Sequence, residues 1–247
     1  MWGAIVLLLQ MLHYTVAAAT VNYFKKRKRK TDSKYSYGRK KMKHSNWVDR
    51  KERDYAVLSK AAYSGSNYLK RKVVRELDTQ GKWTLNNKLS HAETSVFESG
   101  NQVVIAYRGT KLNQDVSTLV SGDLSSDLLL AIGGEGYLNR FKDASSEFQR
   151  IRESYGSDKE YILTGHSLGG SIARYVHNAN KNDVKESHLF NPGAGMSAIF
   201  DPSVYDNMYV YHVSGDAISV LANYNDSNVT SFDAKSGSGS HTVDNFL

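Results

Sequence analysis

The chain has 247 residues, of which 40% are apolar and 23% charged, as is ordinary for a globular protein. It contains no cysteine, which excludes disulfides, thiolate metal sites and a cysteine nucleophile. Residues 1–53 hold 14 Lys and Arg against 3 Asp and Glu, so the net charge of +7 belongs to the start of the chain. Because the folded part does not share this positive charge, we expect no specific nucleic-acid partner.

Residues 1–24 are mostly apolar, and two interpretations of this segment stay open. An uncleaved membrane anchor is favoured by its length and by the basic run Lys25–Lys30, which the positive-inside rule keeps on the cytoplasmic side. A cleaved signal peptide is favoured by the small residues Ala17 and Ala19 before a cut. The sequence therefore predicts a membrane-associated or secreted protein, whose Lys25–Lys30 run can contact anionic lipid headgroups.

Residues 25–49 are rich in Lys and Arg and show no apolar period, which predicts a disordered linker. The folded domain is expected over residues 50–247. It should open with a helix over Tyr55–Tyr63, which Ser64 and Gly65 end. Residues 69–90 are ambiguous, with one strand signal at Lys82–Leu85.

Strand and helix patterns alternate through the rest of the domain. Strands are predicted at Thr94–Glu98, Gln102–Tyr107, Glu160–Thr164, Ser187–Phe190 and Met208–Val213, and helices at Phe141–Tyr155 and Gly169–His177. The first two strands form a hairpin around a Ser-Gly-Asn turn. This alternation predicts an α/β fold with a mostly parallel central sheet and helices on both faces.

A G-x-S-x-G pattern, Gly165-His-Ser-Leu-Gly169, lies between a predicted strand and a predicted helix. This context is what a nucleophile elbow requires, because the serine must stand at a sharp strand-to-helix turn. Glycines at both ends let the strand and the helix approach closely, and the helix N-terminus presents free amide donors. Ser167 is therefore the candidate nucleophile.

A serine nucleophile needs a histidine base and a carboxylate, and in α/β-hydrolases they follow in the order Ser, Asp or Glu, His. Of eight histidines, only His241 lies beyond every late strand, in a Gly/Ser-rich loop. Asp216 directly follows the end of a strand, which is where such folds build their sites. His166, next to the nucleophile, is expected to point away from it and to pack beneath the elbow.

The tetrahedral intermediate of acyl transfer needs backbone donors for its oxyanion. The amide of Leu168, directly after the nucleophile, is one candidate. The other is Thr110, which follows a central strand in the loop Arg108-Gly-Thr110 and has both an amide and a hydroxyl to donate. Arg108 itself could instead be structural and pair with a carboxylate near the end of the sheet.

Four of these motifs occur in one order: Tyr107-Arg-Gly-Thr110, Gly165-His-Ser-Leu-Gly-Gly170, Ser214-Gly-Asp216 and the late His241. Together they resemble the class 3, fungal-type, lipase family of the α/β-hydrolase superfamily over residues 50–247. The resemblance implies a serine hydrolase that cleaves carboxylic esters of lipids, without metal or cofactor. It implies Ser167, Asp216 and His241 as the catalytic residues, and Thr110 and Leu168 as the oxyanion hole.

The family also has a lid helix after the oxyanion loop, whereas residues 111–123 of this chain are largely polar. A phospholipase and a short-chain esterase are alternative activities of the same class. A catalytically silent hydrolase fold, tethered to a membrane and used for binding, is the alternative from a different class.

Overall fold

The computed structural model describes residues 41–42, 50–78, 80–110, 135–193, 205–216 and 228–247. The chain divides into two compact units, Met1–Arg39 and Lys40–Leu247, and every described residue belongs to the second. The anchor, signal-peptide and Lys25–Lys30 predictions therefore lie outside the described residues. Within those residues, no helix has the length and apolar character that crossing a membrane requires.

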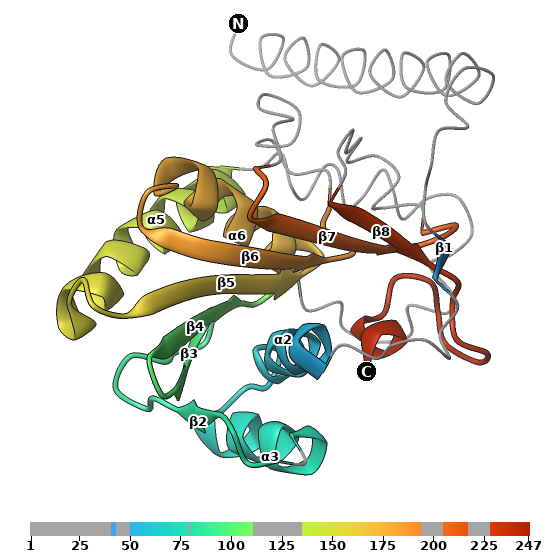
Figure 1. Cartoon of the computed structure of the whole chain (residues 1–247), viewed down its shortest axis with the longest axis horizontal. Coiled ribbons are helices and arrows are strands. Elements are labelled where there is room, and N and C mark those ends of the chain that lie inside the picture. Colours follow the sequence, from blue (N-terminus) through green and yellow to red (C-terminus); the bar gives the residue numbers. More distant parts are fainter. Residues whose placement is uncertain (1–40, 43–49, 79, 111–134, 194–204, 217–227) are drawn as a thin grey trace, which may run out of the picture. The chain divides into compact units, whose positions relative to one another are not determined.

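The described strands form one eight-stranded sheet in the order β1-β8-β7-β6-β5-β4-β3-β2 (Figure 1). Their bounds are β1 Lys41–Met42, β2 Thr84–Leu85, β3 Thr94–Ser99, β4 Gln102–Tyr107, β5 Glu160–His166, β6 Val184–Phe190, β7 Met208–Val213 and β8 Val229–Phe232. All pairs from β1 to β4 across the sheet are parallel, and only β3 and β2 join antiparallel at one edge. The predicted mostly parallel sheet is confirmed.

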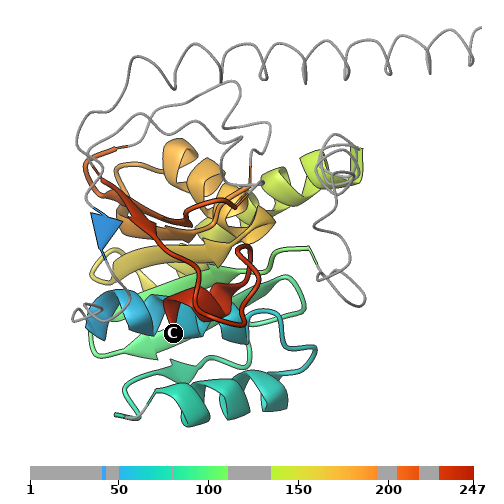
Figure 2. The ribbon, with the colours of Figure 1, turned by 90° about the vertical axis from the view of Figure 1, so that its right-hand side faces the viewer.

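Helices cover both faces of this sheet, as Figures 1 and 2 show. The helices α5 (Glu135–Tyr155) and α6 (Leu168–Ala179) pack on one face, and α2 (Arg50–Ala61), α3 (Asn67–Leu77) and the short 3-10 helix η3 (Val243–Phe246) pack on the other. The central strands contribute side chains to two apolar cores, one on each face of the sheet. In β4, for example, Val103 and Ile105 face α5 and α6, whereas Val104 and Ala106 face α2. Burial on both sides explains why β4 reads as an unbroken apolar run.

The sequence did not predict α3, and the reason is the composition of its inner face. One of the two buried residues of α3 is a lysine, Lys70, whose Nζ donates to the carbonyl of His91 at 2.5 Å, and the other is Val74. An inward-facing lysine removes the apolar periodicity by which a helix is recognised. The start of α3 is nevertheless capped, since Ser66 Oγ accepts from the Leu69 amide.

Short elements at the ends of the domain were also missed. β8 and η3 have four residues each, too few to show a period. β1 lies inside the predicted linker of residues 25–49, where Lys41 and Met42 pair with Ser231 and Phe232 of β8. Pairing with a neighbouring strand organises this polar stretch, which has no pattern of its own, and the other residues of the predicted linker lie outside the described residues.

Candidate active site

Ser167 stands at the turn between β5 and α6 with φ 58° and ψ −127°, a region that glycine occupies readily and other residues do not. Hydrogen bonds hold this strained backbone. The Ser167 amide donates to the Phe190 carbonyl at 3.1 Å, and the Ser167 carbonyl accepts from the amides of Gly170, Ser171 and Gly193. The elbow is therefore fixed by its own helix and by the end of β6.

Two glycines of the elbow stand where no side chain fits. A Cβ on Gly165 would lie within 3.0 Å of the Gly169 backbone, and a Cβ on Gly169 would lie within 3.0 Å of the backbone of Tyr107, at the end of β4. The first contact is the close strand-to-helix approach that the sequence pattern predicts. The second brings the start of α6 directly against the loop that follows β4.

The structure brings together the three side chains that chain order selected. The Nε2 atom of His241 lies 2.8 Å from Ser167 Oγ, and its Nδ1 atom lies 2.9 Å from Asp216 Oδ2. Asp216 is buried, with 1% of its surface exposed, so its carboxylate acts on the imidazole with little competition from water. A carboxylate only accepts hydrogen bonds, so Nδ1 carries the proton and Nε2 is left to accept from the serine hydroxyl.

The acid and the histidine reach Ser167 from separate parts of the fold. Asp216 follows β7 in a tight turn, in which Gly215 has φ +84° and the Asp216 amide donates to the Val213 carbonyl at 3.1 Å. His241 lies in the irregular segment between β8 and η3. Both segments leave the carboxyl ends of parallel strands, where α/β folds place their sites.

The two predicted oxyanion donors also lie at this elbow. Leu168 is the first residue of α6, where backbone amides have no partner within the helix. The Arg108-Gly-Thr110 loop packs on the elbow, because a Cβ on Gly109 would lie 2.6 Å from the His166 carbonyl. Thr110 Oγ1 is buried and has no hydrogen-bond partner among the described residues. The largely polar segment of residues 111–123, at the place of the lid helix in the lipases that the motifs resemble, lies outside the described residues.

Arg108 has the structural role that the sequence left open. Its guanidinium pairs with one oxygen of Glu93, and Arg140 of α5 pairs with the other. Arg140 Nη2 also donates to the Arg108 carbonyl at 2.8 Å. The loop after β4 is thus tied to α5 and to the segment before β3, which confirms the prediction that Arg108 pairs with a carboxylate.

His166, expected to pack beneath the elbow, is buried and contacts the segment that carries His241. Its Nε2 lies 2.7 Å from the His241 carbonyl, and its Nδ1 lies 2.9 Å from the hydroxyl of Tyr63. Burial, helped by the nearby His241 ring, lowers the pKa of His166 to about 3. The ring is therefore neutral at pH 7, with Nε2–H donating to the carbonyl and Nδ1 accepting from Tyr63. No spacing in the sequence indicates either contact.

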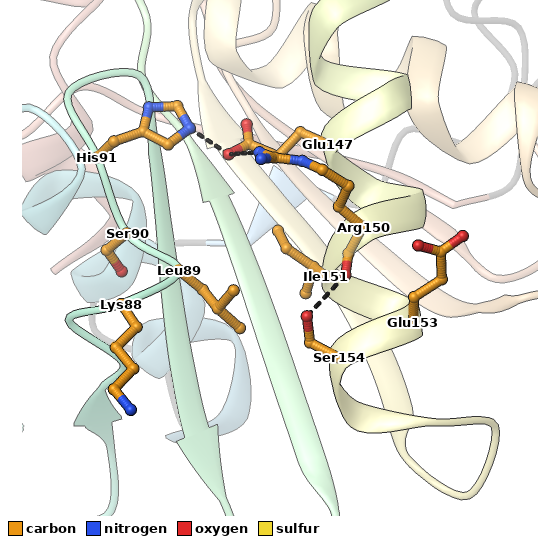
Figure 3. A pocket seen from close by; sticks show the side chains of 9 residues that line it. All are labelled: Lys88, Leu89, Ser90, His91, Glu147, Arg150, Ile151, Glu153 and Ser154. Atoms are coloured by element: carbon orange, nitrogen blue, oxygen red, sulfur yellow. Dashed lines mark hydrogen bonds and ion pairs between the residues drawn. The ribbon is translucent and has the colours of Figure 1, made fainter.

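A hollow of about 460 Å³ lies elsewhere on the domain, between the β2–β3 connection and α5 (Figure 3). Its lining residues are Lys88, Leu89, Ser90, His91, Glu147, Arg150, Ile151, Glu153 and Ser154. Because the lining includes none of Ser167, Asp216 and His241, this hollow is separate from the candidate site. Within the described parts of the chain, no group of three or more His, Cys, Asp or Glu side chains could hold a metal ion.

A mostly parallel sheet with helices on both faces, a strand–serine–helix elbow, and an acid and a histidine after later strands is the α/β-hydrolase fold. The chain has this fold.

Comparison with solved structures finds similarity to fungal lipases. The lipase of Rhizopus microsporus var. chinensis is 15% identical with a TM-score of 0.44, over 70% of this chain and 68% of that one. The Lip2 lipase of Yarrowia lipolytica is 15% identical with a TM-score of 0.42, over 70% and 75%. The mono- and diacylglycerol lipase of Aspergillus oryzae is 16% identical with a TM-score of 0.39, over 69% and 72%.

No protein-family model matches the sequence, and no curated protein sequence does either.

Proposed function

We propose that this chain is a serine hydrolase that cleaves carboxylic esters of lipids through an acyl-enzyme. The observation that carries the proposal is the position of the His241 imidazole, 2.8 Å from Ser167 Oγ and 2.9 Å from Asp216 Oδ2. A serine hydroxyl is a weak nucleophile at neutral pH, and a histidine oriented by a buried carboxylate is the kind of base that activates it.

In the acylation half, Ser167 Oγ attacks the ester carbonyl carbon while its proton moves to Nε2 of His241. Asp216 stays ionised and stabilises the resulting imidazolium. The tetrahedral intermediate then collapses, the C–O bond to the alcohol breaks, and the imidazolium gives its proton to the departing oxygen. In the second half a water molecule attacks the acyl-enzyme, loses its proton to His241 and releases the acid, and Ser167 recovers its proton.

The negative charge of each tetrahedral intermediate falls on the former carbonyl oxygen. The Leu168 amide, at the N-terminus of α6, and the Thr110 amide and hydroxyl are the donors assigned to it. Such donors are fixed before the reaction starts, and loss of a single one typically lowers kcat by about 10²–10³-fold. The buried Oγ1 of Thr110, which has no hydrogen-bond partner among the described residues, fits this role, since a bound oxyanion would give it an acceptor.

The lipid-ester substrate class rests on the motif resemblance over residues 50–247. The test measures turnover of p-nitrophenyl esters of increasing acyl length, of an acylglycerol emulsion and of a phospholipid. We expect turnover that Ser167→Ala abolishes and that Ser154→Ala leaves unchanged, since the Ser154 hydroxyl donates only to a carbonyl of its own helix.

Each readout of this test has a distinct meaning. Preference for long acyl chains in acylglycerols supports the proposal in full. Preference for short acyl chains, or for the phospholipid, would support the serine mechanism and contradict the proposed substrate class. No turnover of any ester by folded protein rejects the enzyme and favours the silent binding protein.

A further inference from the structure

The segment that carries His241 has no regular secondary structure, yet side chains hold four of its carbonyls in succession. Asn245 Nδ2 donates to the carbonyls of Gly239 at 2.8 Å and Thr242 at 3.1 Å. Asn191 Nδ2 donates to the Ser240 carbonyl at 3.0 Å, and His166 Nε2 lies 2.7 Å from the His241 carbonyl. The position of the imidazole is therefore set by these side-chain donors.

Asn245 gives the segment its shape from within. It is completely buried, and its Oδ1 accepts from the Lys235 amide at 2.9 Å while its Nδ2 holds the far side of the loop. The carboxamide of Asn245 thus hydrogen-bonds to both ends of the loop, at Lys235 and at Gly239. This contact fixes the shape of the loop, but it does not connect the loop to the strands of the sheet.

Asn191 makes such a connection, alongside His166, the last residue of β5, which contacts the His241 carbonyl. Asn191 lies directly after β6, is completely buried, and has φ +39°, a left-handed conformation that asparagine tolerates better than most residues. The backbone amide of Asn191 donates to the Tyr211 carbonyl at 2.7 Å, and its side-chain Oδ1 accepts from the Val213 amide at 2.8 Å. The same carboxamide then donates from Nδ2 to Ser240.

Both ends of this bridge adjoin the proposed catalytic groups. Val213 is the last residue of β7, three positions before Asp216, and Ser240 directly precedes His241. A carboxamide is rigid and planar, so the distance between its two partners is fixed. One side chain, that of Asn191, therefore bridges the strand that carries the acid and the loop that carries the histidine.

We propose that Asn191 is a positioning residue, which keeps the His241 imidazole aligned between Asp216 and Ser167. This inference rests on the proposed function. The alignment matters because reacting groups must be held close to productive geometry, and a misplacement of about 1 Å can lower the rate by about 100-fold.

The test compares Asn191→Asp with Asn207→Asp. The first keeps the acceptor for the Val213 amide and removes the shorter of two hydrogen bonds to the Ser240 carbonyl, 3.0 Å from Asn191 against 3.4 Å from Asn245. The second makes the same change where Nδ2 donates to the carbonyls of Val184 and Lys185 at the amino end of β6. With a soluble short-chain p-nitrophenyl ester, we expect kcat to fall by about 100-fold in Asn191→Asp with KM unchanged, and no change in Asn207→Asp.

A second variant, Asn191→Gly, accepts the positive φ without strain and removes both side-chain bonds. Hydrogen–deuterium exchange of residues 235–242, measured without substrate, should be faster in Asn191→Gly than in the wild type and unchanged in Asn207→Asp. Unchanged kcat in both Asn191 variants, or unchanged exchange in Asn191→Gly, would overturn the inference. If the wild type cleaves no ester while exchange still rises, the proposed function fails and the link between Asn191 and the loop stands.

Discussion

Both ring nitrogens of His241 have partners, and this decides which chemistry the side chain can perform. With Nδ1–H directed at Asp216, Nε2 has its lone pair toward Ser167 Oγ. The opposite tautomer would place a proton between Nε2 and the hydroxyl and leave the ring unable to accept the serine proton. The acid is therefore needed for the tautomer as well as for the charge.

Asp216→Asn should remove this control while it preserves the shape of the side chain. An amide can donate to Nδ1 and favour the wrong tautomer, so we expect kcat for a p-nitrophenyl ester to fall by about 10⁴-fold, as such a change does in serine hydrolases generally. Asp206→Asn is the matched control, since Asp206 is exposed and lies before β7. A loss of similar size in both variants, or in neither, would contradict the assignment of Asp216.

Two buried histidines make stability depend on pH. Burial lowers the pKa of His166 to about 3 and that of His177 to about 4, against an ordinary value of 6.5. As pH falls below 6.5 the unfolded chain binds protons at these positions that the folded chain does not bind. The free energy of unfolding should therefore fall with decreasing pH, by at most about 1.4 kcal/mol per pH unit for each histidine.

Urea unfolding of wild type and His177→Gln at pH 7, 6 and 5 checks this prediction. His177 packs against Ser187 and Tyr205, away from the three side chains at Ser167. The variant should lose less stability than the wild type between pH 7 and pH 5. Parallel pH curves for the two proteins would show that His177 takes up its proton equally in the folded and unfolded chains, and would contradict the lowered pKa.

At this scale the sequence identifies side chains whose order along the chain is constrained, and it misses those that act through the backbone. Ser167, Asp216 and His241 follow from a fixed order of residue types. Asn191 and Tyr63 contact the carbonyl of Ser240 and the ring of His166, and such contacts leave no spacing to recognise.

At the level of elements, the β5–Ser167–α6 unit depends on close contact between backbones. A methyl group on Gly169 would meet the Tyr107 carbonyl, and backbone cannot move aside as a flexible side chain can. We expect Gly169→Ala to destabilise the fold by about 1–3 kcal/mol, as overpacking of a core does. Thermal unfolding measures this effect.

Gly239→Ala is the control for this prediction. A Cβ at Gly239 meets no atom within 4 Å, and its backbone lies outside the left-handed region. The melting temperature of Gly239→Ala should match that of the wild type. Equal melting temperatures for Gly169→Ala and the wild type would show that α6 and β4 are not in contact as described.

Elements with both a period and a buried face could be predicted, and others could not. The patterns for β4, β5, α6 and β7 were correct to within a few residues, because burial on one or both faces selects apolar side chains. α3 was missed because its inner face includes Lys70, and β8 because four residues are too few for a pattern.

For the whole molecule, the division into two compact units predicts that the second unit folds and acts without the first. Every residue of the proposed active site lies in the unit Lys40–Leu247, which contains both apolar cores. Deletion of residues 1–39 should therefore leave the fold and the turnover of a soluble short-chain ester unchanged. Circular dichroism and steady-state kinetics of the shortened chain check this, and loss of the fold would contradict the division into units.

The same deletion tests the proposed role of the basic run at the membrane. If Lys25–Lys30 contacts anionic headgroups, binding to phosphatidylserine vesicles should fall sharply in the shortened chain and should weaken with salt in the full chain. Equal vesicle binding by the two proteins would reject this role.

The central claim is that His241 and Asp216 make the Ser167 hydroxyl a nucleophile, and fluorophosphonate labelling tests it most directly. We expect one covalent adduct on the wild type, mapped to Ser167 by peptide mass spectrometry, and labelling of His241→Ala on the order of 10³-fold slower or more. Folded wild-type protein that gives no adduct at Ser167, or His241→Ala labelled at the wild-type rate, would contradict the account.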